Sequence, residues 1–249
     1  MTPQNINNTF FEGFYKDVWR KLIPHGLTEA EADFIVDIAS LEKESKVLDL
    51  MCGYGRHSLE LAKRGAQVTA VDNSSDYIDE IKQVANSNGL AVETFCEDVI
   101  TILLDDVYDV AICMGNSFAF FKEEEVLKLL RNLSSFLKRG GTFIINTWMI
   151  GEIAMRHYRE KDWFYVEDYK YLVDNKYCFN PTRIESDHII IRSDGETETL
   201  KAVDYIFTLA ELQSLLEQTG FNLKEVYSTP RKRKFQFGDT KAYIVAEKK

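Results

Sequence analysis

The chain has 249 residues, of which 45% are hydrophobic, and a formal net charge of −10. This length allows one large domain, or a domain with an insertion, to bury a full core without disulfide or metal staples. The acidic excess opposes binding to nucleic acid, because that affinity rests largely on Lys and Arg at the phosphates. No run approaches the roughly 18 uncharged residues of a membrane-spanning helix, so we expect a cytoplasmic protein without a membrane anchor.

Two local features were weighed as signs of a metal or a nucleic-acid partner. The four cysteines are scattered without a C-x-x-C pair or a histidine at metal spacing, so neither a disulfide framework nor a metal site is predicted. The run Arg231-Lys232-Arg233-Lys234 is basic, but it has no interleaved aromatic residues. A solvated loop is the better interpretation of this run, with a phosphate contact as the alternative.

The first 45 residues predict two helices. Residues 9–22 carry aromatic side chains at helical spacing, and Thr28 to Glu31 has the pattern of a capping box at the start of a second helix. Pro24 separates the two.

From Lys46 onward, short apolar strands alternate with amphipathic helices, which is typical of a parallel sheet covered on both faces. The expected strands are 46–50, 67–71, 91–95, 109–114 and 142–146. The expected helices are 56–64, 75–86 and 123–138, ended by Gly65, Gly89 and Gly140.

The alternation stops after Thr147. An aromatic segment leads into alternating stretches at 182–192 and 198–207, joined by the hairpin signal Ser193-Asp194-Gly195, and this predicts an antiparallel insertion. A capping box at Thr208 then opens a helix, and strands at 221–227 and 241–247 follow with no helix between them. The fold class is therefore α/β: a doubly wound, Rossmann-like, seven-stranded sheet with an antiparallel last strand and a β insertion after the fifth strand.

The stretch from Val47 to His57 carries the chemistry. A buried strand runs into a glycine turn, Gly53-Tyr54-Gly55, and then into a helix N-terminus, where a ligand can approach the backbone. Asp72 ends the next strand, seventeen residues beyond Gly55, where a doubly wound fold places an acid against ribose hydroxyls. Asp49 precedes the glycines and would repel a pyrophosphate, whereas S-adenosylmethionine carries an ammonium and a sulfonium and no phosphate.

With these residues the chain resembles the Rossmann-like class I S-adenosylmethionine-dependent methyltransferases, whose first motif is an acidic residue followed by G-x-G-x-G. The resemblance extends over 46–249, and Met51 stands where the family has its first glycine. It implies S-adenosylmethionine as the methyl donor and a division into three parts. N-terminal helices at 1–45 would cover the cofactor, 46–147 with 208–249 would form the core, and 148–207 would form a cap that selects the acceptor.

The resemblance also implies roles for single residues. Asp49, Gly53 and Gly55 would surround the methionine moiety, with Arg56 and Tyr15 as partners for its carboxylate. Asp72 is expected at the ribose, and Asn73 beside it near the adenine. Asp98 and Val99 are expected at the adenine, and Met114 and Asn116 at the sulfonium.

Each of these roles has a structural alternative. Asp72 could cap a helix and Asp98 could form a turn, because aspartate favours both settings. Met114 could simply fill the core. Of the histidines, His57 is expected at a helix start and His25 and His188 at the surface.

Methyl transfer mainly requires alignment of donor and acceptor and exclusion of water. A hydroxyl acceptor would also need a general base, for which His157 and Tyr205 are the candidates. The aromatic segments indicate a small-molecule acceptor, with the oligomeric state left as monomer or homodimer. The other hypotheses are an RNA methyltransferase, a nicotinamide-dependent dehydrogenase, which lacks the third glycine of its fingerprint here, and a non-catalytic binding module.

Overall fold

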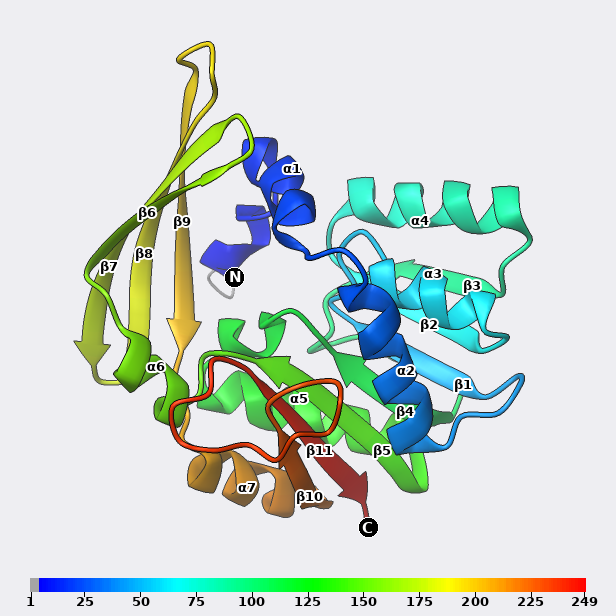
Figure 1. Cartoon of the computed structure of the whole chain (residues 1–249). Coiled ribbons are helices and arrows are strands. Elements are labelled where there is room, and N and C mark those ends of the chain that lie inside the picture. The colour runs from blue at the N-terminus through cyan, green and yellow to red at the C-terminus, as the bar shows by residue number, and fades with distance from the viewer. Residues whose placement is uncertain (1–4) are drawn as a thin grey trace.

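A seven-stranded sheet runs through the centre of the computed structural model, which describes residues 5–249 (Figure 1). The strand order is β10-β11-β5-β4-β1-β2-β3. The strands from β3 to β5 are parallel, and β11 is antiparallel to both β5 and β10. Their bounds are β1 (Lys46–Leu50), β2 (Gln67–Asp72), β3 (Val92–Cys96), β4 (Tyr108–Cys113), β5 (Leu137–Thr147), β10 (Phe221–Tyr227) and β11 (Ala242–Lys248). The predicted fold class is confirmed.

Helices cover both faces of this sheet. α2 (Leu27–Ala39), α3 (Arg56–Lys63) and α4 (Ser75–Asn88) cover one face, while α5 (Glu123–Phe136) and α7 (Leu209–Gln218) cover the other. Strand β1 shows why, because Val47 packs toward α2 and α3 and its neighbour Leu48 packs toward α5, and both are fully buried. Within residues 5–249, no helix is both long and apolar enough to cross a membrane.

A second, four-stranded antiparallel sheet stands beside the core, in the order β6-β7-β8-β9 (Figure 1). Its strands are β6 (Lys161–Val166), β7 (Tyr169–Phe179), β8 (Thr182–Ile191) and β9 (Thr197–Tyr205), and α6 (Gly151–His157) links it to β5. We call residues 148–207 the cap. The predicted hairpin between β8 and β9 is confirmed, whereas β6 and β7 were not predicted as separate strands.

The N-terminal segment lies between the two sheets. It comprises the short 3-10 helix η1 (Ile6–Thr9) and α1 (Gly13–Leu22) (Figure 1). The apolar face of α1 packs on the cap, where Tyr15 and Val18 share a buried cluster with Tyr171 and Ile190. The apolar contacts of α1 are therefore made with the cap.

Three predicted helix boundaries were wrong. The first helix, expected over 9–22, begins at Gly13, after the separate 3-10 helix η1. The helix expected to reach Lys138 ends at Phe136, because Leu137 is already extended and pairs with Tyr108, so Gly140 lies within β5 at φ +75° instead of capping a helix. The capping box at Thr28 is absent, because the N-cap of α2 is Gly26, two residues earlier, and the side chain of Glu31 turns inward to other partners. The capping box at Thr208 is present as predicted.

Candidate functional site

The carboxyl ends of β1, β2, β3 and β4 meet at one edge of the sheet and open into a cavity of about 900 Å³. In open α/β sheets ligands bind at this edge, and the volume is within the range of pockets for small molecules. The opposite wall comes from the N-terminal segment, with Asn7 of η1, Trp19 of α1 and Phe11 between these two elements. The cavity thus lies between the core and the N-terminal segment.

The turn after β1 has three residues in the left-handed region: Met51 at φ +55°, Gly53 at +55° and Gly55 at +76°. A Cβ on Gly55 would lie 2.5 Å from Ile81, so only glycine lets α4 pack here. A Cβ on Gly53 would meet no atom within 4 Å, so the backbone at Gly53 faces open space where a ligand can approach. Met51 takes a conformation that glycine adopts without strain, which explains the glycine usual at this position in the family.

Asp72 joins two of the loops that form the cavity. Its Oδ2 accepts from the backbone N–H of Gly53 at 2.8 Å and its Oδ1 from that of Ser74 at 2.9 Å. The N-cap of α4 is Ser74, so the helix-capping alternative for Asp72 does not apply. Burial raises the pKa of Asp72, which lines the cavity as a nearly buried carboxylate.

Asp49 lies deeper, at the base of the same wall. It is 1% exposed, and its Oδ2 accepts from the hydroxyl of Ser58 at 2.6 Å. Burial raises the pKa of Asp49, because the charged form is poorly solvated there.

Arg56 lines the cavity, but its Nη1 is occupied by structural partners. It donates to Glu31 at 2.6 Å and to Thr28 at 3.1 Å. Glu31 also pairs with His57 and accepts from the hydroxyl of Tyr243 at 2.7 Å. Arg56 is therefore held firmly at the edge of the cavity by a buried carboxylate, and His57 is a buried member of the same network.

The remaining predicted cofactor residues divide into two groups. Asn73, Asp98, Val99 and Met114 line the cavity. Asp98 also closes a turn by accepting from the Ile100 backbone N–H at 2.8 Å, as its structural alternative proposed. Tyr15, Gly55 and Asn116 are outside the residues that line the cavity.

The cavity wall is strongly acidic. Seven carboxylate side chains line it against three from Lys and Arg. The acidic residues are Glu12, Asp49, Asp72, Asp76, Glu97, Asp98 and Glu125, and the basic residues are Lys16, Arg56 and Lys128. This balance favours a cationic ligand over a pyrophosphate, whose negative charges would be repelled.

The N-terminal segment is attached to the core across this cavity by ion pairs. Arg20 of α1 forms a bidentate pair with Glu80 of α4 at 2.6 and 2.8 Å, and Lys16 pairs with Asp76 at 3.3 Å. Arg20 also lies over the ring of Tyr54, within the glycine turn, at 4.5 Å from its centroid. The contact of α1 with the core is therefore mainly electrostatic.

Behind the wall, a buried group of polar side chains joins the core to the cap. Asn116, at the end of β4 and at φ +74°, donates to Asp204 of β9 at 3.0 Å and accepts from Thr147 at 2.7 Å. His188 was expected at the surface, but it packs against Tyr15 and its Nδ1 pairs with the Tyr171 hydroxyl. Burial lowers the pKa of His188 to about 4, so this imidazole is neutral near pH 7.

The two candidate general bases are elsewhere. His157 is exposed at the end of α6, where its Nε2 pairs with the Gly238 carbonyl at 3.2 Å. Tyr205 follows Asp204 in β9, and successive strand residues point to opposite faces, so Tyr205 faces away from α1. Neither residue is among those that line the cavity.

Sequence reasoning missed Asp204, the buried carboxylate of β9 that Asn116 contacts behind the cavity wall, and Trp19, which lines the cavity. A signal for Asp204 existed, because it is an acidic residue on the inward-facing register of an alternating strand. The alternation at 198–207 predicts only the strand.

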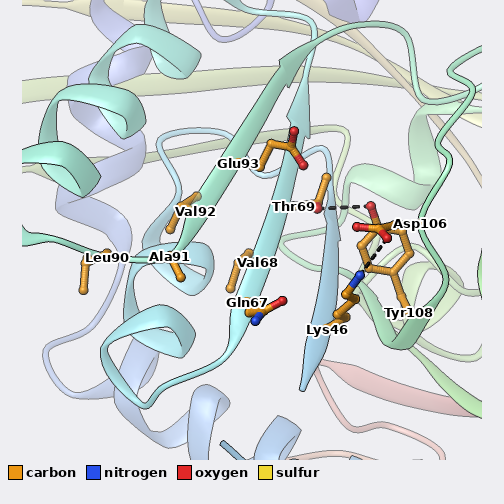
Figure 2. Close-up of a pocket in the computed structure, with 10 residues that line it drawn as sticks. All are labelled: Lys46, Gln67, Val68, Thr69, Leu90, Ala91, Val92, Glu93, Asp106 and Tyr108. Atoms are coloured by element: carbon orange, nitrogen blue, oxygen red, sulfur yellow. Dashed lines mark hydrogen bonds and ion pairs between the residues drawn. The ribbon is translucent and has the colours of Figure 1, made fainter. Parts of the chain in front are cut away.

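A smaller cavity lies at the opposite edge of the sheet, around the starts of β1, β2 and β3 (Figure 2). Its volume is about 350 Å³. Figure 2 shows two pairs among its polar groups, Lys46 with Asp106 and Tyr108 with Thr69. In sheets of this kind the ligand site is at the carboxyl edge, so we assign no function to this cavity.

The basic run near the C-terminus is largely neutralised by acidic partners. Lys232 pairs with Asp37, Arg233 with Asp239 and Lys234 with Glu225. These pairs agree with the interpretation of the run as a solvated loop.

Comparison with known proteins finds a methyltransferase domain in part of the chain. Residues 47–141 match the sequence profile of a methyltransferase domain. The chain is 27% identical to a glycine/sarcosine N-methyltransferase from Aphanothece halophytica, over 74% of this chain and 67% of that protein. It is 29% identical to an enzyme of the same name from Parasynechococcus marenigrum, over 58% of this chain and 55% of that protein.

The fold has close structural neighbours. A crystal structure of an S-adenosylmethionine-dependent methyltransferase from Clostridium acetobutylicum superposes with a TM-score of 0.80 at 16% identity, covering 94% of this chain and 96% of that one. At this identity the likeness concerns the fold. The glycine turn, the acidic cavity and the methyltransferase-domain match over 47–141 agree with the resemblance to the class I S-adenosylmethionine-dependent methyltransferases.

Proposed function

We propose that this enzyme transfers the methyl group of S-adenosylmethionine to a small molecule held between the edge of the core sheet and the cap. The observation that carries the proposal is the acidic cavity at the carboxyl edge of β1 to β4, which continues under the aromatic side chains of α1. We further propose the division into N-terminal helices at 1–45, a core at 46–147 and 208–249, and a cap at 148–207.

The residues present fit this donor. Gly53 offers open backbone, Asp72 lies at the end of β2 where ribose hydroxyls are expected, and the wall is acidic, as suits a sulfonium and an ammonium. Asp98 and Val99 would hold the adenine, and Arg56 the donor carboxylate. When bound, the donor supplies a methyl group on a positively charged sulfur, which an acceptor with a free electron pair can take up directly.

The side chains of the protein position the two ligands and exclude water from the cavity. Trp19 closes the cavity from α1 and lies against the backbone at Gly115, with Cζ2 3.3 Å from the position of a Cβ there. Met114 is 5% exposed and lines the cavity beside Gly115. These apolar groups would exclude water from the place where donor and acceptor meet.

Two measurements test the proposal. S-adenosylhomocysteine should bind the protein by calorimetry and raise its melting temperature, while NAD should do neither, because ligands bound only by the native state stabilise it. With S-adenosylmethionine labelled in its methyl group, label should pass from the donor into a new small-molecule product of a cell extract, separated from the donor by chromatography, and not into the RNA fraction. Absence of S-adenosylhomocysteine binding would refute the cofactor assignment, and label in RNA would refute the acceptor class.

A further inference from the structure

Asp204 is a buried carboxylate with one oxygen unused. The residue is 9% exposed, and its Oδ1 accepts from Asn116 at 3.0 Å. Among residues 5–249, no donor is hydrogen-bonded to its Oδ2. A buried charge is costly unless it is paired, so this second oxygen is suited to a cationic partner that the chain alone does not supply.

Asp204 lies directly behind the cavity wall. Its partner Asn116 lies between Gly115 and Ser117, which both line the cavity. On the other side, Asn7 of η1 lines the cavity and is hydrogen-bonded through its amide to both backbone groups of Val203. The inner end of the cavity and the inner face of β9 are thus adjacent.

Aromatic rings surround the same place. Trp19 lies 6.2 Å from Trp148 and 6.4 Å from Phe11, measured between ring centroids, and it stacks with Tyr15 at 6.3 Å. Asp204 is close enough to Tyr15 that, after burial, its charge is the next cause of the raised pKa of that phenol. Ring faces attract cations, so the aromatic groups and the carboxylate favour the same kind of ligand.

We propose that Asp204 and these rings form an ammonium subsite, so that the acceptor is a primary or secondary amine that enters with its nitrogen protonated. This inference rests on the proposed methyl transfer to a small molecule and specifies its acceptor. Asp204 Oδ2 would pair with the ammonium N–H and Asn116 would hold Oδ1 in place.

The same pair prepares the amine for reaction. Before methylation, one proton passes from the ammonium nitrogen to Asp204 Oδ2, which leaves a neutral amine with a free electron pair and a neutral carboxylic acid. Burial raises the pKa of Asp204 to about 7, so this carboxylate takes up a proton far more readily than an exposed aspartate. The proton returns to water when the methylated product leaves.

A purely structural role for Asp204 is the competing explanation, since it also orients Asn116. The substitution Asp204→Asn separates the two, because an Asn side-chain oxygen can still accept from Asn116 but carries no charge. Asp187→Asn is the matched control. Asp187 is on the neighbouring strand β8, where it forms an exposed pair with Lys201.

The probes are cyclohexylamine and cyclohexanol, which have similar shapes and differ in charge. Their dissociation constants would be measured by ligand-observed NMR on protein saturated with S-adenosylhomocysteine, whose own affinity is measured by calorimetry. We expect the amine to bind the native protein and Asp187→Asn at least tenfold more tightly than the alcohol. In Asp204→Asn this preference should fall to twofold or less, while S-adenosylhomocysteine affinity stays within twofold.

The outcomes separate this inference from the proposed function. Equal affinity for amine and alcohol in the native protein, or an amine preference that survives Asp204→Asn, would overturn the ammonium subsite even if methyl transfer to another acceptor is observed. Failure of S-adenosylhomocysteine to bind would overturn the proposed function instead. An Asp204-dependent amine preference in a protein that methylates no small molecule would support the subsite alone.

Discussion

Glu31 is 1% exposed, and its two oxygens serve Arg56, His57 and Tyr243. It therefore joins α2 to the start of α3 and to β11, directly behind the cavity wall. Although burial acts to raise its pKa, the hydrogen bond and charge of His57, together with Arg56, lower it to about 2. The charged carboxylate is thus the stable form of Glu31 in the folded protein.

We predict that Glu31→Ala destabilises the protein by about 3–5 kcal/mol in urea unfolding at pH 7, because Arg56 is left buried without its counter-charge. Glu29→Ala, on the exposed side of the same helix, should change the free energy of unfolding by about 0.5 kcal/mol or less. A loss from Glu31→Ala no larger than that of the control would contradict the prediction.

The lowered pKa of Glu31 makes the stability of the protein depend on pH. Because the folded pKa of Glu31 is below its ordinary value of 4.5, its contribution to stability is fully present above pH 4.5 and is lost as the pH falls toward 2. The unfolding free energy of the native protein should therefore fall more steeply than that of Glu31→Gln between these pH values. Parallel curves for the two proteins would show that Glu31 does not carry this dependence.

We predict that Asp72→Ala weakens S-adenosylhomocysteine binding by about 1–3 kcal/mol, because the ribose hydroxyls would be buried without an acceptor. The variant also loses the bonds to Gly53 and Ser74, so Asp72→Asn, which keeps an acceptor oxygen, should lose less affinity. Calorimetry measures both, with Asp79→Ala on the exposed face of α4 as the control. Unchanged affinity in a folded Asp72→Ala would restrict this residue to holding the turn.

At the scale of elements, α1 packs on the cap through apolar side chains and reaches the core mainly through ion pairs. The side chains of Arg20 and Glu80 are each 34% exposed, so their pair is partly solvated. Such pairs contribute about 0.2–1 kcal/mol, and salt weakens them. The free energy that holds α1 over the cavity should therefore be small and should depend on salt.

We predict that Arg20→Gln weakens S-adenosylhomocysteine binding by up to about fivefold at low ionic strength, because a fraction of the molecules would have α1 undocked from α4. The difference from the native protein should shrink in about 1 M salt, where the pair is already screened. Lys21→Gln, which removes a pair between α1 and Glu167 of the cap, should leave the affinity within about twofold. A salt-independent difference would mean that Arg20 acts through packing.

The core elements could be predicted from sequence because each carries a local signal. The strands β1, β2 and β4 are short apolar runs, and Gly89 ends α4 in the left-handed conformation that its position indicates. Other features depend on partners distant in sequence. Leu137 leaves the helix because it pairs with Tyr108. Glu31 turns inward because it accepts a hydrogen bond from Tyr243, which is 212 residues away in the sequence.

The acidic and glycine positions around the cavity were predictable because strand ends converge at one edge of a parallel sheet. Asp49, Gly53, Asp72 and Asp98 all follow from that rule and the family motif. The inner face of the cap did not follow, because the strand register that brings Asp204 to Asn116 is set by pairing across three strands. The predicted Tyr205 is one position away from Asp204, the residue that points inward.

At the scale of the whole molecule, the cap begins where β5 ends and returns where α7 begins. The two ends of the cap are bridged, with Ile150 beside Phe207 and the N–H of Gly151 donating to the Phe207 carbonyl at 2.9 Å. The cap is thus inserted at a single point of the core, on the edge that carries the cavity. An insertion closed at its base can be removed with little disturbance to the strands that flank it.

We predict that replacing residues 148–207 by a short Gly/Ser linker abolishes methyl transfer and leaves S-adenosylhomocysteine binding measurable, though weaker. Transfer should be lost because the deletion removes Asp204 and Trp148. Binding should persist because Asp49, Gly53, Asp72 and Asp98 belong to the remaining core. It should be weaker because the face of α1 formed by Tyr15 and Val18 loses the surface that buries it, so α1 would no longer be held over the cavity.

Calorimetry and transfer of radiolabel would be measured on the same preparation, with cooperative urea unfolding as evidence that the core is folded. Retained methylation of an acceptor used by the native enzyme would refute a substrate-selecting cap, and complete loss of binding in a folded variant would show that the cofactor site extends into it.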